Sequence, residues 1–456
     1  MKKTIAAIST PPGTGGIAVI RISGDQALKI GDRIFRGRGK LSDAASHTIH
    51  YGFIVNEQNE KIDEVLVSVM RAPKTFTTED TIEINTHGGT MTVQNVLTTV
   101  IKAGAVMAEP GEFTKRAFLN GRIDLSQAEA VIDIINSKNE LSRKNALSQL
   151  EGTLSKEIRA IRQELVHLAA RMQVLIDYPD EELEDVTEQE IEQIVSQCAE
   201  RAGKLLDTAD NGKIIKDGIR TAIAGKPNVG KSSLLNSLAR ADRAIVTDIA
   251  GTTRDVIEES VNLNGVPILL TDTAGIRDTD DAVEKIGVER SKKSIQEADL
   301  VLVMLDGSEL LTDEDRSVLR ATHDKKRIII INKTDLGRPK YTEAVRAKAN
   351  GDPVLEISAL TGSGLEELAA EIRQIYNFHA MSGNSGAVIT NMRHKQALLA
   401  AREALYRAAD AIQSGMPADI ASIDMNEAIS ALGEITGETV SDDIVNEIFH
   451  HFCVGK

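Results

Sequence analysis

The chain has 456 residues, with 53 Lys and Arg against 68 Asp and Glu, a formal net charge of −15. At roughly 100–200 residues per domain this length predicts two to four domains, and an apolar content of 41% excludes a wholly disordered chain. The acidic balance argues against a protein that coats nucleic acid with its whole surface, although it permits a local basic patch.

The sequence favours a cytoplasmic protein without a membrane segment. No stretch approaches the ~18 uncharged apolar residues of a membrane span. The first residues resemble the charged region of a signal peptide, but Pro11, Pro12 and four glycines from Gly13 to Gly24 interrupt any apolar segment after it. Cys198 and Cys453 lie far apart, which excludes a disulfide framework and a CxxC metal site.

Residues 1–118 are predicted to form a small α+β domain with one helix. Gly16–Ile22, Asp63–Met70 and Thr81–Asn85 are β-rich runs with partial alternation of apolar and polar residues. A helix is expected between residues 92 and 102, because apolar residues recur there at helical spacing. These apolar residues are Val93, Val96, Leu97, Val100 and Ile101.

Residues 119–216 are predicted to form the first half of a helical domain. Ser126-Gln127-Ala128-Glu129 has the pattern of a capping box. Apolar residues from Ile158 to Leu175 recur at helical spacing, and Tyr178-Pro179 is expected to end that helix. Thr187 is expected to open the next helix, and Asn211-Gly212 to end the helical section.

Residues 217–379 are predicted to form an α/β domain with a mainly parallel sheet, because strand-like runs alternate with helices. Asn264-Gly265 predicts an antiparallel hairpin at one edge. Residues 380–456 are again helical in pattern, so the α/β domain is expected to interrupt a helical domain. The expected strands are Arg220–Ala224, Pro267–Thr271, Leu300–Leu305, Arg327–Ile331 and Val354–Ile357.

The run Gly225–Ser232 fits the pattern G-x-x-x-x-G-K-[ST] and lies between an apolar strand and a helix expected from Ser233. In this setting, backbone N–H groups close around phosphates at a helix N-terminus. Lys231 is expected to reach the β- and γ-phosphates, and Ser232 to bind Mg²⁺. The loop residues expected to contact nucleotide are Asn228, Val229, Gly230, Lys231, Ser232 and Ser233.

Three further segments follow in the order of the guanine-nucleotide motifs of translation-factor-like GTPases, which they resemble. Asp272-Thr273-Ala274-Gly275 ends a strand and supplies a carboxylate for the metal side and an N–H for the γ-phosphate. In Asn332-Lys333-Thr334-Asp335, the last carboxylate can accept from the N1–H and amine of guanine, a donor pair that adenine lacks. Ser358-Ala359-Leu360 offers a backbone N–H for guanine O6. Guanine is therefore the expected base.

Two chemical roles stay open from these residues alone. Ile276 stands where many small GTPases carry a water-orienting Gln, so either hydrolysis is negligible or another polar residue orients the water. Arg254 can act as an arginine finger, or Asn228 and backbone carbonyls of the segment 247–255 can hold a monovalent cation; Asn228 can also simply cap the loop. The candidates for the water-orienting residue are Asp255, Arg277, Asp278 and Glu284.

Motifs along essentially the full chain resemble those of the MnmE (TrmE) family of tRNA-modification GTPases. They are Thr10–Gly16, Pro110–Asn120, Gly225–Ser233, Thr247–Asp255, Asp272–Arg277, Val283–Gly287 and Phe452–Lys456, which carries a C-x-G-K ending. The resemblance implies α/β plus α+β architecture in three domains. These would be a folate-binding and dimerisation domain (1–118), a discontinuous helical domain (119–216 and 380–456) and an inserted P-loop, Ras-like G domain (217–379).

The resemblance also implies a potassium-dependent GTPase whose G domains pair across a homodimer during hydrolysis. Asn228, Thr247, Ile249 and Thr252 would hold K⁺ in place of an arginine finger, and Ser232 and Thr253 would bind Mg²⁺. Glu284 would orient the attacking water. The further nucleotide contacts would be Thr247, Asp248, Ile249, Ala250, Gly251, Thr252, Thr253, Asp272, Thr273, Ala274 and Gly275.

A site for 5-formyl- or 5,10-methylene-tetrahydrofolate is implied near the N-terminus. Arg21, Glu83, Arg122 and Lys456 would contact it. Without the resemblance, Glu83 would be taken for a strand-face acid and Arg122 for a surface charge. Cys453 has two interpretations, an activated nucleophile near the folate or a small apolar group beneath Phe449 and Phe452.

The family function would be modification of the wobble uridine of certain tRNAs at C5 with an aminomethyl or carboxymethylaminomethyl group. The flavoprotein MnmG (GidA) would be the partner, in a heterotetramer or larger complex that makes most of the tRNA contacts; this chain has no dinucleotide fingerprint of its own. The alternative is a regulatory GTPase switch on the ribosome or a stress pathway, which would need neither Arg21, Glu83, Arg122 nor the C-x-G-K ending.

Overall fold

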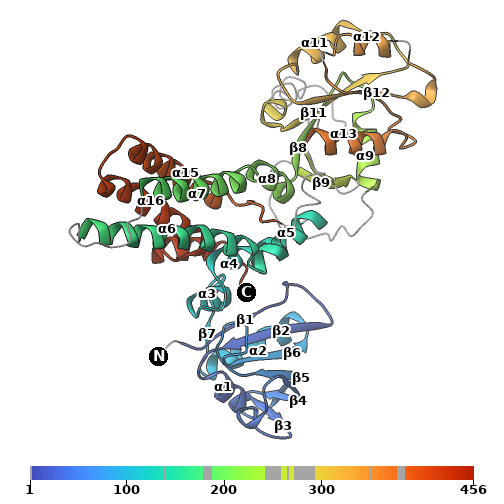
Figure 1. Cartoon of the computed structure of the whole chain (residues 1–456). Helices are drawn as coiled ribbons and strands as arrows, with labels where there is room; N and C mark the ends of the chain where they lie inside the picture. The colour runs from blue at the N-terminus through green and yellow to red at the C-terminus, as the bar shows by residue number, and fades with distance from the viewer. Residues whose placement is uncertain are drawn as a thin grey trace. The chain divides into compact units, whose positions relative to one another are not determined.

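The computed structural model describes residues 3–137, 139–177, 187–241, 258–263, 266–271, 293–339, 341–349, 351–376 and 386–456. The chain divides into two compact units (Figure 1). The first unit comprises Met1–Ile135, Ala146–Gly203 and Gln396–Lys456, and the second comprises Asn136–Asn145 and Lys204–Lys395. Among the described helices we find no candidate for a membrane-spanning segment.

The first unit contains a seven-stranded sheet in the order β3-β4-β5-β6-β2-β1-β7. Its inner face packs on α1 (Ala27–Ile34) and α2 (Thr90–Lys102) around a core that includes Ile20, Val67 and Ile82. The predicted strands and α2 are confirmed, but the expectation of one helix is wrong, because α1 and α3 (Glu112–Leu119) are also present. The strands are β1 (Ile5–Ile8), β2 (Ile17–Ser23), β3 (Phe35–Gly37), β4 (Thr48–Val55), β5 (Lys61–Met70), β6 (Thr81–His87) and β7 (Val106–Met107).

The opposite face of this sheet carries exposed apolar side chains. Ile17, Ile49, Tyr51 and Leu66 are each between 48% and 68% exposed. Tyr51 and Leu66 are directly paired across β4 and β5. Because side chains alternate along a strand, this row shares its face with the polar residues that project outward from β2 and β6.

The helices of the first unit come from both flanks of the second. The buried positions Ile158, Leu165 and Met172 confirm the predicted stripe on α6 (Thr153–Asp177), which packs against α16 (Ala418–Thr436). The expected stop at Tyr178-Pro179 lies outside the described residues. The other helices that lie wholly or partly in this unit are α4 (Leu125–Asn136), α5 (Glu140–Leu150), α7 (Glu188–Leu206), α15 (Met392–Gln413) and α17 (Asp442–His450).

The capping box predicted at Ser126-Glu129 is wrong. The Oδ1 of Asp124 accepts from the Gln127 N–H at 2.9 Å, and the Oε1 of Gln127 accepts from the Asp124 N–H at 3.0 Å. Ser126 lies inside the first turn of α4, where its hydroxyl bonds to Asp124 and Ser155. The helix starts earlier than expected because Asp124 is an equally good cap and because it brings the fully buried Leu125 into the helix.

The second unit contains a six-stranded sheet in the order β13-β12-β11-β8-β10-β9. Among the described strands of this sheet, only β9 pairs antiparallel, with β10, so the mainly parallel sheet and the antiparallel edge pair are confirmed. Asn264 and Gly265, the predicted turn between the two strands, lie outside the described residues. The strands are β8 (Ile219–Ala224), β9 (Glu258–Leu263), β10 (Val266–Thr271), β11 (Leu300–Asp306), β12 (Arg327–Asn332) and β13 (Val354–Glu356). Its helices include α8 (Ala209–Asp217), α9 (Lys231–Ala241), α11 (Asp313–Ala321), α12 (Thr342–Arg346) and α13 (Leu365–Ile375).

The predicted helix end at Asn211-Gly212 is also wrong, because both residues lie within α8. A Cβ on Gly212 would lie 2.0 Å from the carbonyl oxygen of Ile389. The glycine therefore marks the close approach of α8 to a distant backbone segment rather than a turn.

We expect Gly212→Ala to destabilise the protein by about 1–3 kcal/mol, because the added methyl group meets backbone that cannot rotate away. An alanine in a helix interior ordinarily stabilises by up to about 1 kcal/mol relative to glycine. Gly203→Ala in α7 is the control, since its Cβ would have 3.9 Å to the nearest atom, Arg402 Cδ. Thermal unfolding of both variants and of the unaltered chain checks the prediction. A melting temperature of Gly212→Ala equal to or above that of the unaltered chain would refute it.

Candidate functional site

The phosphate loop Gly225–Ser232 follows β8, and α9 begins at Lys231 rather than at Ser233 as predicted. Asn228 and Gly230 have φ values of 63° and 99°, so the loop turns through left-handed backbone at both positions. A Cβ on Gly230 would lie 2.3 Å from Asn332 Nδ2. The loop is therefore closed tightly against the end of β12.

Lys231 is oriented by its own loop. Its Nζ donates to the carbonyl oxygens of Gly225 at 2.8 Å and Lys226 at 2.9 Å, and burial lowers its pKa. An ammonium group has three N–H donors, so a third is available to a phosphate. Ser232 and Ser233 directly follow Lys231 in the sequence and are exposed in the first turn of α9.

Asn332 joins three parts of the predicted nucleotide site. Its Nδ2 donates to Val229 O in the phosphate loop at 2.7 Å, and its Oδ1 accepts from the Ala359 N–H at 2.9 Å. The loops after β8, β12 and β13 thus meet at one buried side chain. Ala359, predicted to offer its N–H to guanine O6, gives that N–H to Asn332 in this structure.

Asp335 and Lys333, which are predicted to lie beside the guanine base, follow β12. Ser358 Oγ donates to Asp335 Oδ1 at 2.6 Å, and the Asp335 side chain is exposed. Lys333 Nζ donates to Asp306 Oδ2 at 2.6 Å. Burial alone would raise the pKa of Asp306, but the hydrogen bonds from Lys333 and Ser308 hold it below its ordinary value.

The remaining predicted nucleotide and metal residues lie outside the described residues. Their assignments therefore stay predictions. They are Thr247, Asp248, Ile249, Ala250, Gly251, Thr252, Thr253, Asp272, Thr273, Ala274, Gly275 and Glu284, together with the alternative candidates Arg254, Asp255, Arg277 and Asp278.

Two of the residues predicted to bind folate lie on the outer face of the seven-stranded sheet. Arg21 on β2 is paired with Glu83 on β6, with 2.7 Å between Nε and Oε1. Arg21 Nη1 and Ser9 Oγ each lie 3.1 Å from the Gly455 carbonyl oxygen, which accepts from both. The structure therefore brings Arg21 and Glu83 to the C-terminal tail that ends in Lys456.

Arg122, predicted with this set, has other partners. Its Nη1 donates to Phe76 O at 3.0 Å, and its guanidinium carbon lies 4.9 Å from the Phe76 ring centroid. Arg122 lines a cavity of about 560 Å³ with His47, Lys74 and others. In the described part of the chain, no hydrogen bond or ion pair joins it to Arg21 or Glu83.

Cys453 is exposed, so its alternative placement as an apolar group beneath two phenylalanines is wrong. Phe449 and Phe452 are buried and contact each other with ring centroids 5.0 Å apart. Through its backbone, Cys453 O accepts from the Gly111 N–H at 3.3 Å, just before α3. The tail is thus held by main-chain hydrogen bonds, while Cys453 is exposed.

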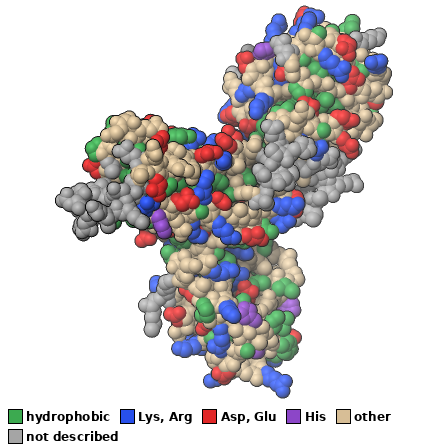
Figure 2. Space-filling view, viewed as in Figure 1, with side chains coloured by type: hydrophobic (Ala, Val, Ile, Leu, Met, Phe, Trp, Pro, Cys, Tyr) green, Lys and Arg blue, Asp and Glu red, His purple; other side chains and the backbone are tan. Residues whose placement is uncertain are grey.

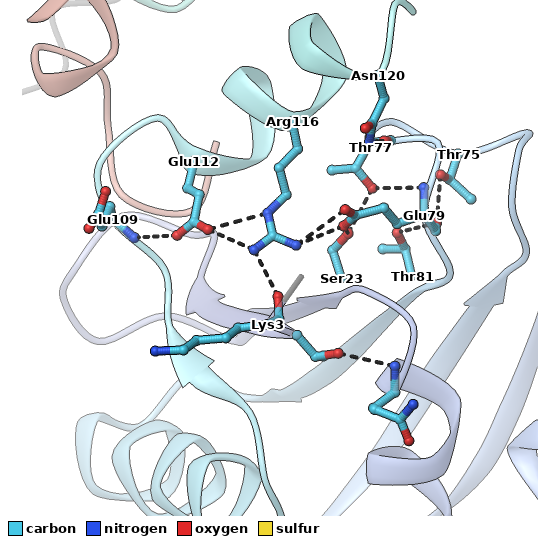
Figure 3. Close-up of polar contacts among 12 residues, drawn as sticks. Lys3, Ser23, Thr75, Thr77, Glu79, Thr81, Glu109, Glu112, Arg116 and Asn120 are labelled. Atoms are coloured by element: carbon cyan, nitrogen blue, oxygen red, sulfur yellow. Dashed lines mark hydrogen bonds and ion pairs between the residues drawn. The ribbon is translucent and has the colours of Figure 1, made fainter. Parts of the chain in front are cut away.

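A buried ion cluster that the sequence did not predict holds α3 in place (Figure 3). The guanidinium of Arg116 lies 3.0 Å from Glu79 Oε2 and 2.7 Å from Glu112 Oε1, and it donates to Lys3 O at 2.8 Å. Ser23 Oγ also donates to Glu79, at 2.8 Å. The only sequence signal for this cluster is the helical i, i+4 spacing of Glu112 and Arg116.

Comparison with known proteins gives family-model matches and relatives that span the full chain. The family model for the MnmE helical domain matches residues 125–453, and the one for the GTP-binding protein TrmE N-terminus matches residues 4–122. The tRNA modification GTPase MnmE of Acetivibrio thermocellus is 49% identical over 454 residues, covering 99% of each chain. The proteins of the same name from Lactobacillus delbrueckii subsp. bulgaricus and Listeria innocua are each 50% identical over 454 residues. They cover 98% and 99% of those proteins, and 99% of this chain in each case.

These matches confirm the resemblance and the predicted fold class. They span the N-terminal seven-stranded sheet, both helical segments and the α/β unit that contains the phosphate loop and Asn332. The chain therefore belongs to the MnmE family of tRNA modification GTPases.

Proposed function

We propose that this chain is a potassium-activated GTPase that acts in the cytoplasm with a flavoprotein of the MnmG (GidA) type. Together they would install an aminomethyl or carboxymethylaminomethyl group at C5 of the wobble uridine, U34, of certain tRNAs, using a tetrahydrofolate one-carbon unit. The observation that carries the GTPase part is the Asn332 bridge, which joins the phosphate loop to Ala359 beside the Asp335–Ser358 pair. Near 50% identity over the full chain supports the tRNA part.

The oxygen donors suit the two metal ions of the proposal. Hydroxyl, amide and carbonyl oxygens are the ligands that hard cations prefer. Ser232 is exposed at the start of α9 and would bind Mg²⁺ with Thr253, while Asn228 is exposed in the loop and would hold K⁺ with Thr247, Ile249 and Thr252. When bound, these ions would supply positive charge beside the β- and γ-phosphates.

The Arg21–Glu83 pair and the tail support the folate site. The Glu83 carboxylate suits the amino-pyrimidine edge of a pterin, and Arg21 and Lys456 suit the anionic glutamate tail. Arg122 remains a proposed contact of the same cofactor, on the strength of the family motif. Cys453, exposed at the tail, is proposed to lie near the folate, with its chemical role open.

The exposed row on the sheet supports a homodimer. Ile17, Ile49, Tyr51 and Leu66 lie on the face that also carries Arg21 and Glu83. Large apolar side chains exposed on one face commonly mark an interface when they form a patch, as the paired Tyr51 and Leu66 do. In Figure 2, Lys and Arg are interspersed with Asp and Glu on the visible surface of each unit. This mixture supports a division of labour in which the complex makes most of the tRNA contacts.

Mass spectrometry of tRNA nucleosides from a deletion strain tests the proposed function. We expect C5-aminomethyl-type uridines to disappear, to return with the intact gene, and to stay absent with Lys231→Ala. Modified uridines that persist in the deletion strain would contradict the proposal and favour the regulatory switch.

Folate binding to the full chain tests the one-carbon site separately. We expect Arg21→Met to weaken the binding of 5-formyl-tetrahydrofolate about tenfold or more, because a charge-assisted hydrogen bond contributes about 1.5–3 kcal/mol. Arg36→Met is the matched control, since Arg36 donates only to backbone carbonyls of residues 32–35. Titration calorimetry checks the result, and equal affinities for the two variants would remove Arg21 from the site.

A further inference from the structure

Lys226 is a loop residue whose side chain the phosphate-loop motif does not require. It fills one of the unspecified positions in G-x-x-x-x-G-K-[ST]. Its side chain is only 11% exposed, and its Nζ lies 3.2 Å from Asp315 Oδ2 and 3.2 Å from Glu309 Oε2. The phosphate-loop motif does not explain why this side chain is largely buried, so the explanation has to come from the residues that pack around it.

Asp315 provides the reason for this burial. It is part of the capping box of α11, where its Oδ2 accepts from the Thr312 N–H at 2.9 Å and the Thr312 hydroxyl at 2.7 Å. Its side chain is 3% exposed, whereas that of Glu309 is 62% exposed. A buried carboxylate needs a counter-charge, and the ammonium of Lys226 supplies it.

The segment 306–315, from the last residue of β11 to the first turn of α11, therefore contacts both halves of the nucleotide site. Asp315, at its end, binds Lys226 of the phosphate loop, and Asp306, at its start, binds Lys333 beside the base-binding Asp335. Lys226, Asp306 and Lys333 line one cavity of about 530 Å³, together with Asn228. Like the Asn332 bridge, this segment ties the phosphate loop to the residues that follow β12.

The main chain of Lys226 links this ion pair to the reacting end of the site. Its carbonyl oxygen is one of the two acceptors that orient Lys231 Nζ, at 2.9 Å. If the Lys226 side chain loses its anchor, that carbonyl is free to shift, and a change in the direction of Lys231 Nζ weakens its hydrogen bonds to phosphate, which depend steeply on angle.

We propose that Lys226 is a positioning residue for GTP: its buried ion pair with Asp315 fixes the first turn of the phosphate loop and so the direction of Lys231. GTP and GDP both carry a β-phosphate, which the phosphate loop would bind. Loss of the Lys226–Asp315 pair should therefore lower the affinity for both nucleotides more than it lowers turnover.

The test compares Lys226→Met, Lys226→Arg and the control Lys293→Met in the full chain. Lys293 pairs at 3.8 Å with Glu297 on an exposed helix face, so the control removes the same charge without a buried partner. We expect Lys226→Met to raise KM for GTP and Kd for GDP about tenfold or more, with kcat within about threefold. Lys226→Arg, which keeps the charge, should stay within about threefold of the original chain. Equal affinities for Lys226→Met and Lys293→Met, or no rescue by arginine, would overturn the proposal.

Thermal unfolding separates positioning from a loss of stability. We expect the rise in Tm caused by saturating GDP to shrink in Lys226→Met and to stay unchanged in Lys293→Met, since ligand stabilisation follows affinity. A lower Tm for Lys226→Met with the same GDP-induced rise would show a structural role only. Adding Asp315→Asn to Lys226→Met should change KM by less than about twofold, because the pair is already broken; multiplied effects would contradict the proposed pair.

Discussion

Asp335→Asn is expected to move the base preference of the chain from guanine towards xanthine. The Asp335 carboxylate is exposed and is oriented by Ser358, 2.6 Å away. It would accept two hydrogen bonds from guanine, and hydrogen bonds to charged groups contribute about 1.5–3 kcal/mol each. Losing the pair should weaken GDP binding by about 100-fold or more, at 1.36 kcal/mol per tenfold change. The asparagine amide can instead donate to the additional oxygen of xanthine.

Competition binding with GDP and XDP checks this expectation. Asp324→Asn, on a fully exposed residue of the same unit, is the matched control and should leave both affinities unchanged. A variant that keeps its guanine preference would contradict the pairing of Asp335 with the base. A variant that loses both nucleotides equally would point to a damaged loop instead.

Glu284→Ala is expected to lower GTP turnover by about 100-fold or more while the Kd for GTP stays within about threefold. The proposed role of Glu284 is to orient the attacking water, and positioned acid–base groups contribute about 10²–10⁴-fold. Ile276 cannot replace it, because its side chain has no hydrogen-bonding atom. Glu284 lies outside the described residues, so the family motif is the basis for this assignment.

Single-turnover hydrolysis and equilibrium binding together check this role. A parallel fall in affinity and rate would show that Glu284 contacts the phosphates rather than the water. Unchanged turnover would assign the orientation of the attacking water to Asp255, Arg277 or Asp278, the other candidates from the sequence.

The α/β unit was predictable because its central strands are buried on both faces. Leu300–Asp306 and Arg327–Asn332 form nearly continuous apolar runs that end at motif residues. β1 and α1 were missed for local reasons. Ile5–Ile8 contains two alanines, which carry little strand preference, and Ala27–Ile34 contains a glycine that weakens a helical pattern.

Glycine and capping signals failed where tertiary contacts decided. Asn211-Gly212 has the composition of a helix end, yet the structure uses the missing Cβ of Gly212 to let Ile389 approach. Two overlapping capping-box patterns occur at the start of α4, one from Asp124 to Gln127 and one from Ser126 to Glu129. The burial of Leu125 favours the pattern that begins at Asp124. A short sequence pattern carries no information about the contact between Gly212 and Ile389 or about the burial of Leu125.

The site shows the same division. The residues predicted to contact nucleotide follow fixed motifs, because phosphate and guanine chemistry dictates their type and spacing. The residues that support them do not: Lys226 meets Asp315 from 89 positions away, and Arg116 meets Glu79 from 37 positions away. Their spacing follows the fold, so only the structure identifies these pairs.

GTP turnover of the full chain in K⁺ and in Na⁺, at equal ionic strength and saturating Mg²⁺, tests whether K⁺ activates hydrolysis at the proposed cation site. We expect turnover to be several-fold or more higher in K⁺, because Asn228 and the carbonyl groups of residues 247–252 would hold this ion where other GTPases place an arginine. Asn228→Ala should remove the difference. Equal turnover of the unaltered chain in both salts would contradict the account.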